Sequence, residues 1–245
     1  MVCFLALIEY DGTAYFGFQR QLEAFPTVQG ELERALTAIC HHPVSITGAG
    51  RTDAGVHALG QVISFTINWR HESESLLRAL NANLPDDIAV LQLKTVLPSF
   101  HPRYDARRRA YKYMIYNVPV RSPIRRMSSW HVRNQLDVSK MNAAAQFLLG
   151  KHDFSTFGSP PQGTNCVRKV YKAEWQRQGE MLVFFIEADA FLYKMVRSLV
   201  GSMKLVGEGK WSIEMFAEAV AKKDRSYSGK VAPPQGLYLF SVTYD

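Results

Sequence analysis

One stretch of the chain, Gly48 to Ala58, combines the residue types that a cofactor-free active site needs. Arg51, Asp53 and His57 supply a cation, a carboxylate and an imidazole, and glycines stand among them. An ionised aspartate can act as a nucleophile or as a general base, and glycines leave room beside it. The alternating apolar residues at 59–67 predict a half-buried strand directly after the stretch. A polar loop on a rigid support is therefore expected, although Asp-Ala-Gly taken alone is more typical of an ordinary turn.

Hydrophobic periodicity predicts the elements that must position this loop. In the first hundred residues it predicts strands at 2–9, 44–47, 59–67 and 88–96 and helices at 28–41 and 73–84. After Pro102 it predicts strands at 110–117, 167–177, 181–188 and 237–244 and helices at 138–149, 191–206 and 213–223. Two tandem split β-α-β units predict an α+β protein with mainly antiparallel sheets, in the manner of ferredoxin-like and RNA-recognition folds. The predicted subdomains are 1–102 and 103–245.

Composition indicates a polyanionic partner and a reducing compartment. The 245 residues carry 29 Lys and Arg against 22 Asp and Glu, a formal net charge of +7. Cys3, Cys40 and Cys166 are too few and too irregularly spaced for a disulfide framework, so free thiols in the cytoplasm are expected. No apolar run approaches the roughly 20 residues that a membrane span requires.

The positive charge is concentrated between His101 and Arg133, where nine cations face a single acid, Asp105. The cations are Arg103, Arg107, Arg108, Arg109, Lys112, Arg121, Arg125, Arg126 and Arg133. Most charge runs are solvated surface. Here Tyr104, Tyr111, Tyr113 and Trp130 are interleaved with the cations, and such a mixture suits phosphates and unstacked bases together. A nucleic acid is therefore expected ahead of an anionic membrane, for which the basic amphipathic helix is missing.

Two more segments carry polar groups in unusual settings. The segment from Thr13 to Pro26 mixes aromatic, amide and cationic side chains, which can stack on and hydrogen-bond to unpaired bases. Within it, Phe16 and Phe18 are expected to fold back into the core. Arg197 stands among apolar residues of a predicted helix, where an unpaired charge is costly. Pairing with Asp53 is expected, and snorkelling of the guanidinium to solvent is the alternative.

Several common chemistries are excluded because their motifs are missing. The histidines form no H-E-x-x-H and the cysteines no C-x-x-C, so a metal site is not expected. No G-x-G-x-x-G follows a strand, and Gly209-Lys210 is followed by Trp211 rather than by Ser or Thr. A G-x-S-x-G elbow is also absent. What remains is a site without metal or cofactor, centred on Asp53.

With these residues in place, the chain closely resembles the tRNA pseudouridine synthase A (TruA) family. The resemblance covers essentially the whole chain in family order, and its most specific part is the Arg-Thr-Asp-Ala-Gly-Val-His core. Its segments are Tyr10-Asp11-Gly12 with Tyr15, Gly17 and Gln19; Thr27-Val28-Gln29; Gly50 to Ala58; Tyr111-Lys112-Tyr113; Phe191 through Met195-Val196-Arg197 to Gly201; and Gly236 to Leu239. The chain departs from the family at Ala110, where an arginine is common, and in the loop from Pro119 to Arg133.

The resemblance implies a pseudouridine synthase fold with an active cleft between the two subdomains. It implies an isomerase that converts uridine to pseudouridine in the tRNA anticodon stem-loop, at positions 38, 39 and 40, without metal or cofactor. A cytoplasmic homodimer and tRNA binding are expected as well. The family match assigns catalysis to Asp53, Arg51 and Arg197, and substrate binding to Tyr111, Arg51, His57 and Gln19. Because a stacked base is out of reach, the uridine must be flipped, and Arg51 is expected to fill the vacated space.

Reasoning from the residues leaves several alternatives open. Asp53 can attack the ribose, attack the base or abstract a ribose proton. Arg51 can instead form a plain salt bridge with Asp53. Tyr111 and Tyr113 suit a packed strand tyrosine equally well, so only the family match prefers Tyr111 for the pocket. A non-catalytic RNA-binding protein and a base-releasing glycosidase are the rival functions.

Overall fold

The computed structural model of the 245-residue chain describes residues 1–21 and 25–244. It is a mixed α+β fold of mainly antiparallel strands, as the sequence predicts. The chain folds into two compact units, Met1–Arg107 with Tyr238–Asp245, and Arg108–Leu237. The proposed subdomains 1–102 and 103–245 stay a prediction. In the described ranges, no helix has the length and apolar character needed to cross a membrane.

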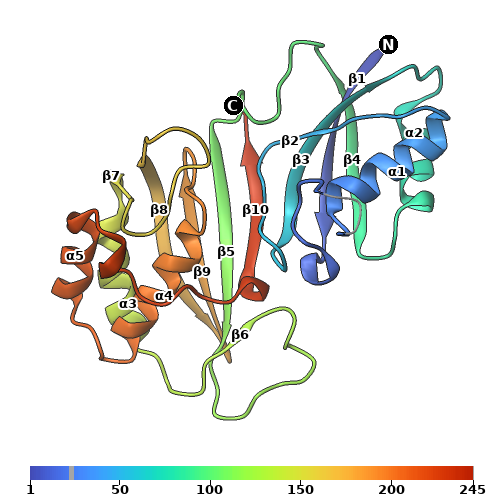
Figure 1. Cartoon of the computed structure of the whole chain (residues 1–245). Coiled ribbons are helices and arrows are strands. Elements are labelled where there is room, and N and C mark those ends of the chain that lie inside the picture. Colours follow the sequence, from blue (N-terminus) through green and yellow to red (C-terminus); the bar gives the residue numbers. More distant parts are fainter. Residues whose placement is uncertain (22–24, 245) are drawn as a thin grey trace. The chain divides into compact units, whose positions relative to one another are not determined.

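The first unit has the predicted β-α-β-β-α-β order. Its elements are β1 (Val2–Tyr10), α1 (Val28–Cys40), β2 (Thr47–Gly48), β3 (His57–Ile67), α2 (Ser73–Asn83) and β4 (Ile88–Val96). The strands run antiparallel in the order β4-β1-β3, and β2 pairs with β3. This is a ferredoxin-like arrangement, and α1 and α2 pack side by side (Figure 1). Thr27 caps α1 by accepting a hydrogen bond from the Gly30 amide, as predicted.

The C-terminal strand β10 (Leu237–Thr243) pairs with β3 in parallel, with Tyr238 opposite His57 and Leu239 opposite Ala58. Strand β1 occupies one edge of β3 along its whole length. The other edge is shared, because β2 pairs only with Ile63 and Ser64, further along the strand. The segment 49–56 therefore leaves the sheet between the two partners and returns to it at His57.

The second unit also consists of an antiparallel sheet and helices. Its elements are β5 (Arg108–Tyr116), β6 (Trp130–His131), α3 (Val138–Ala145), β7 (Gly150–Asp153), β8 (Val167–Gln178), β9 (Met181–Ala188), α4 (Met195–Gly207) and α5 (Ile213–Lys222). Its strand order is β5-β9-β8-β7, and β6 pairs with β5 in parallel. The helices gather against one side of these strands (Figure 1). In that core Trp175 stacks on Phe184 at 4.9 Å and donates its indole N–H to the Met203 sulfur.

Two predicted elements differ from the structure for identifiable reasons. The strand expected at 44–47 is reduced to β2, because side chains of α1 bond both backbone polar groups of Ile46 in place of a neighbouring strand. The helix expected from Phe191 begins only at Met195, since Lys194 adopts the left-handed region with φ of 61° and Tyr193 bridges to Ser159. The very short strands β6 and β7 were not predicted, because so few residues cannot show a hydrophobic period.

Candidate active site

Residues 49–56, here called the Asp53 loop, are fixed to the sheet at both ends. The Ala49 amide donates to the Val62 carbonyl at 2.8 Å, and the Gln61 side chain donates to the Gly50 carbonyl at 2.9 Å. At the other end a turn closes where the Val56 amide donates to the Asp53 carbonyl, with Gly55 at φ of +74°. Asp53 is half-buried at the start of this turn. The predicted polar loop on a strand support is therefore present.

The segment 10–18 packs against the Asp53 loop backbone to backbone. The Phe18 amide donates to the Thr52 carbonyl at 3.1 Å, and the Tyr10 hydroxyl lies 2.8 Å from the Thr52 hydroxyl. Two glycines permit this approach. A Cβ on Gly12 would lie 2.0 Å from the Val56 carbonyl oxygen, and one on Gly17, at φ of +96°, would lie 2.7 Å from that of Thr52. The glycines in this part of the sequence are thus required by contact with the Asp53 loop.

The aromatic residues of the segment 13–26 have separate roles. Phe18 is 3% exposed, which confirms the expected core position. The same expectation for Phe16 is wrong, since Phe16 is 49% exposed and contacts Phe25 at 4.8 Å. The positive φ of Gly17 turns the chain between the two rings, so they point to different sides. Gln19 is exposed, and residues 22–24 of the predicted loop lie outside the described residues.

His57 is held by groups of the protein itself. Its ring is 4% exposed and stacks on Tyr238 at 4.6 Å. The Gly12 amide donates to Nδ1 at 3.1 Å, and an Asp11 carboxylate oxygen lies 3.0 Å from the same nitrogen. Partial burial opposes ionisation of Asp11, but hydrogen bonds from Thr13 and the charge of His57 bring its pKa below the usual value. His57 thus ties β3 to the segment 10–18, and its substrate contact stays a prediction.

The two strand tyrosines of β5 differ in their surroundings, which the sequence could not tell apart. Tyr111 is 9% exposed, and its ring meets Phe191 edge to face at 4.9 Å. Tyr113 is fully buried and donates its hydroxyl to the Pro233 carbonyl at 2.8 Å. Burial raises the pKa of Tyr113 far above its usual range. Its ring also packs on Gly236, where a Cβ would lie 2.6 Å from the ring carbon Cζ. Tyr113 is therefore a packing residue.

Arg197 lies half-buried in the first turn of α4 and is anchored to the segment 229–232. Its Nε donates to the Ala232 carbonyl at 2.7 Å, and the Ala232 amide donates back to the Arg197 carbonyl at 3.0 Å. This crossing needs Gly201, because a Cβ there would lie 1.8 Å from the Lys230 carbonyl oxygen. The side chain is thereby oriented without depending on solvent. Its pairing with Asp53 stays a prediction.

The cations of the basic stretch differ in their partners. Arg108 pairs with Glu187 at 2.9 Å and stacks over Tyr171 at 4.2 Å, and Arg109 donates to the Asp189 carbonyl. The loop 118–129, in contrast, contains Arg121, Arg125 and Arg126, all exposed, and no acidic residue. Within it, Arg125 lies over the Tyr116 ring at 5.3 Å and Arg126 donates to the Pro123 carbonyl at 2.9 Å. Ile124 in the same loop is 92% exposed. This loop is the better candidate for phosphate contact, since its arginines have no carboxylate of their own segment to neutralise them.

The polar groups present suit general acid–base or nucleophilic chemistry. Within residues 1–21 and 25–244, no three His, Cys, Asp or Glu side chains cluster so as to hold a metal ion. The first unit supplies Asp53, exposed Arg51 and Gln19, and buried His57, whereas Tyr111 and Arg197 belong to the second. Sequence reasoning missed Glu33, which bonds the backbone just before the Asp53 loop. Its signal was an acidic residue between the apolar positions of a predicted helix.

Comparison with known proteins gives the class and then the family. A sequence model described as tRNA pseudouridine synthase matches residues 6–105 and 144–245. The tRNA pseudouridine synthase A of Shewanella loihica is 47% identical over 238 residues, 97% of this chain and 91% of that protein. Those of Coxiella burnetii (strain Dugway 5J108-111) and Thermoanaerobacter sp. (strain X514) are 44% and 43% identical, covering 97% and 98% of this chain and 91% and 98% of the respective proteins.

Fold and matches together define a pseudouridine synthase, the class of isomerases that converts uridine to pseudouridine. Within that class, the chain belongs to the tRNA pseudouridine synthase family.

The close approach at Gly17 leads to a test that separates contact from backbone strain. Gly17→Ala places a methyl group 2.7 Å from the Thr52 carbonyl at a positive φ, whereas Gly179→Ala adds a methyl at φ of +60° with nothing within 4 Å. We expect Gly179→Ala to cost about 1 kcal/mol of unfolding free energy and to keep activity. Gly17→Ala is expected to cost more, about 2–4 kcal/mol, and to slow pseudouridine formation. Urea unfolding and single-turnover assays measure both, and equal behaviour of the two variants would contradict the contact.

Proposed function

We propose that this chain isomerises uridines 38, 39 and 40 in the anticodon stem-loop of tRNA. Conversion of uridine to pseudouridine follows from its family. The positions 38, 39 and 40 rest on the resemblance to the tRNA pseudouridine synthase A family. The observation that carries the catalytic proposal is the Asp53 loop, a half-buried aspartate in a turn fixed at both ends. In the reaction the bond between N1 of the base and C1′ of the ribose breaks, the uracil rotates, and C5 bonds to C1′. The proton on C5 is lost and N1 gains one, so neither oxidant nor co-substrate is required.

The residues divide the work according to their settings. We assign the essential carboxylate to Asp53, whose loop cannot drift because two hydrogen bonds and the segment 10–18 hold it. Arg51 is two residues away and exposed, so its guanidinium can contact the RNA backbone or fill the space left by a flipped nucleotide. Tyr111 is assigned to the flipped uracil, and Arg197, oriented by Ala232, to charge balance for Asp53.

The substrate RNA is expected to contact the loop 118–129 as well as the catalytic groups. We further propose that the protein acts as a homodimer in the cytoplasm, in keeping with its free cysteines. A non-catalytic RNA-binding protein is the alternative, and the family match disfavours it. A base-releasing glycosidase is separated by mass spectrometry, because isomerisation leaves the RNA mass unchanged and base loss does not.

Asp53→Asn tests the chemistry directly. Because the amide keeps the shape of the side chain but cannot take a proton or attack, we expect folding and tRNA affinity to be retained. Pseudouridine formation should fall at least about 100-fold, because a positioned proton-transfer group typically contributes roughly 10²–10⁴-fold to the rate. The measurement is single-turnover conversion of tRNA by saturating enzyme. Near-normal turnover would remove Asp53 from the reaction.

The tyrosine pair gives a second test with its own control. Tyr111→Phe should retain tRNA binding and lose turnover, by roughly 10²-fold if the hydroxyl transfers a proton. Tyr113→Phe removes a buried hydrogen bond to Pro233 and should cost about 1 kcal/mol of stability with turnover unchanged. Rates and urea unfolding of both variants are compared. A slow Tyr113→Phe beside a normal Tyr111→Phe would reverse the assignment.

The loop 118–129 is tested by replacing Arg121, Arg125 and Arg126 together with serine. Loss of three phosphate contacts should weaken tRNA binding and reduce the slope of log affinity against log salt by roughly 2–3. The matched control replaces three exposed cations of the first unit, Arg70, Arg78 and Lys94. It removes the same charge and should leave most of the slope unchanged. Equal slopes for both triple variants would show that only net charge matters.

A further inference from the structure

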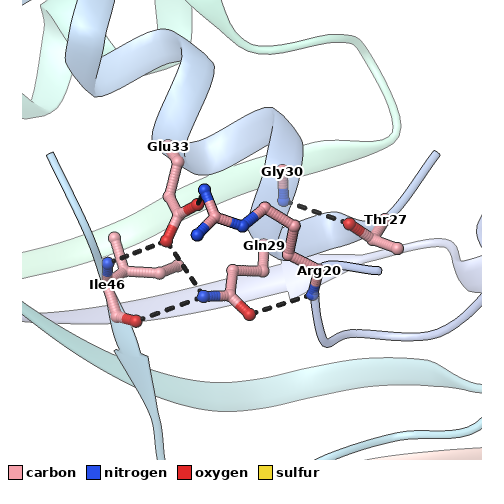
Figure 2. Close-up of polar contacts among 6 residues, drawn as sticks. All are labelled: Arg20, Thr27, Gln29, Gly30, Glu33 and Ile46. Carbon is pink, nitrogen blue, oxygen red and sulfur yellow. Dashed lines mark hydrogen bonds and ion pairs between the residues drawn. The ribbon is translucent and has the colours of Figure 1, made fainter. Parts of the chain in front are cut away.

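A polar network centred on the buried Glu33 joins helix α1 to the backbone of Arg20 and Ile46 (Figure 2). Its centre is Glu33, whose side chain is only 8% exposed. Glu33 Oε1 accepts hydrogen bonds from the Ile46 amide at 3.1 Å and from the Gln29 side chain at 2.9 Å. Arg20 Nη1 lies 2.9 Å from Oε2, but Arg20 is 64% exposed, so solvent screens this ion pair.

Gln29 completes the network from one helical turn earlier. Its Oε1 accepts from the Arg20 amide at 3.0 Å, and its Nε2, besides contacting Glu33, lies 3.4 Å from the Ile46 carbonyl oxygen. The two side chains therefore bond both polar backbone groups of Ile46 and the backbone of Arg20. Figure 2 shows the amide and the carboxylate between these two segments.

Each of the two bonded segments is connected to the Asp53 loop, one along the chain and the other by a hydrogen bond. Ile46 precedes β2, which runs into the Asp53 loop at Ala49. Arg20 ends the segment in which the Phe18 amide donates to the Thr52 carbonyl, next to the carboxylate. The α1 N-terminus holds this segment too, because the Gln29 amide donates to the Phe18 carbonyl at 2.9 Å. The segment that precedes the loop and the segment that packs against it are thus both held by Glu33 and Gln29 of α1.

We propose that Glu33 and Gln29 are positioning residues for the isomerisation, acting through the backbone of the Asp53 loop. Reacting groups must be held closely, since a displacement of about 1 Å can cost roughly 10²-fold in rate. Neither side chain supplies the chemistry, and both act by holding the backbone at Ile46 and Arg20. The proposal rests on the proposed function, because pseudouridine formation is its readout.

Two substitutions of Glu33 separate the backbone anchor from the charge. Glu33→Leu removes the acceptor for Ile46, whereas Glu33→Gln keeps a carbonyl oxygen for Ile46 and loses the charge facing Arg20. We expect Glu33→Leu to lower the single-turnover rate roughly 10- to 100-fold, with tRNA affinity within about twofold. Glu33→Gln should react within about threefold of the wild type. Rates are measured at a temperature at which circular dichroism shows each variant folded.

Glu31→Leu is the control on the same helix, because the Glu31 carboxylate pairs with the exposed Arg34 instead of bonding the backbone that Glu33 and Gln29 hold. It should react like the wild type. If Glu33→Leu does not fold, Gln29→Leu gives the same test, because it removes the bonds to Arg20 and Ile46 without leaving α1 uncapped. A slow but folded Gln29→Leu with unchanged affinity supports the proposal.

The outcomes distinguish this proposal from the function on which it rests. A wild-type protein that forms no pseudouridine in tRNA would overturn both. An active wild type with a folded Glu33→Leu or Gln29→Leu of normal rate would overturn the positioning role alone and leave these residues a purely structural one. A Glu33→Gln as slow as Glu33→Leu would also overturn it, by assigning the effect to the ion pair with Arg20.

Discussion

The site depends on the contact between the backbone of segment 10–18 and that of the Asp53 loop. Where two backbones meet this closely, a side chain on either one would separate them, and Gly12 and Gly17 remove that obstacle. The Thr52 carbonyl then accepts a hydrogen bond from the Phe18 amide. A polar loop between two strands thereby obtains a partner for its backbone from within the protein. A carboxylate carried on such a loop has little freedom left to lose when substrate binds.

The second unit uses the same device for a different residue. Gly201 lets the segment 229–232 cross helix α4, where its Ala232 exchanges two hydrogen bonds with Arg197. Ser202 supports the crossing by accepting from the Gly229 amide. In both units glycines let two backbone segments approach closely, and the hydrogen bonds formed there fix the backbone that carries Asp53 in the first unit and the Arg197 side chain in the second. Gly12, Gly17, Gly201 and Gly236 of the family segments are thus explained by close contacts, whereas Gly55 serves the turn after Asp53.

Much of the fold follows from periodicity and capping, whereas the fine structure of the site does not. The alternation at 59–67 predicted β3, and the spacing after Thr27 predicted α1, because both elements bury one face. The prediction of where α4 begins was wrong. Phe191 and Leu192 continue the apolar period of the helix, but tertiary contacts at Gly158 keep them out of it. The distinction between Tyr111 and Tyr113 was invisible, because two positions of one parity share a face and only the partner at Pro233 separates them.

The buried position of Glu33 on α1 is unusual for a carboxylate. Its neighbours Leu32 and Leu36 are buried, so an apolar residue at position 33 would pack without the cost of desolvating a carboxylate. The ion pair with Arg20 does little to offset that cost, since Arg20 is 64% exposed and solvent screens it. What only an acceptor at this position provides is a partner for the amide of Ile46, which precedes β2 and lies outside the sheet. The carboxylate is therefore better explained by the path of the backbone towards Asp53 than by the packing of the helix that carries it.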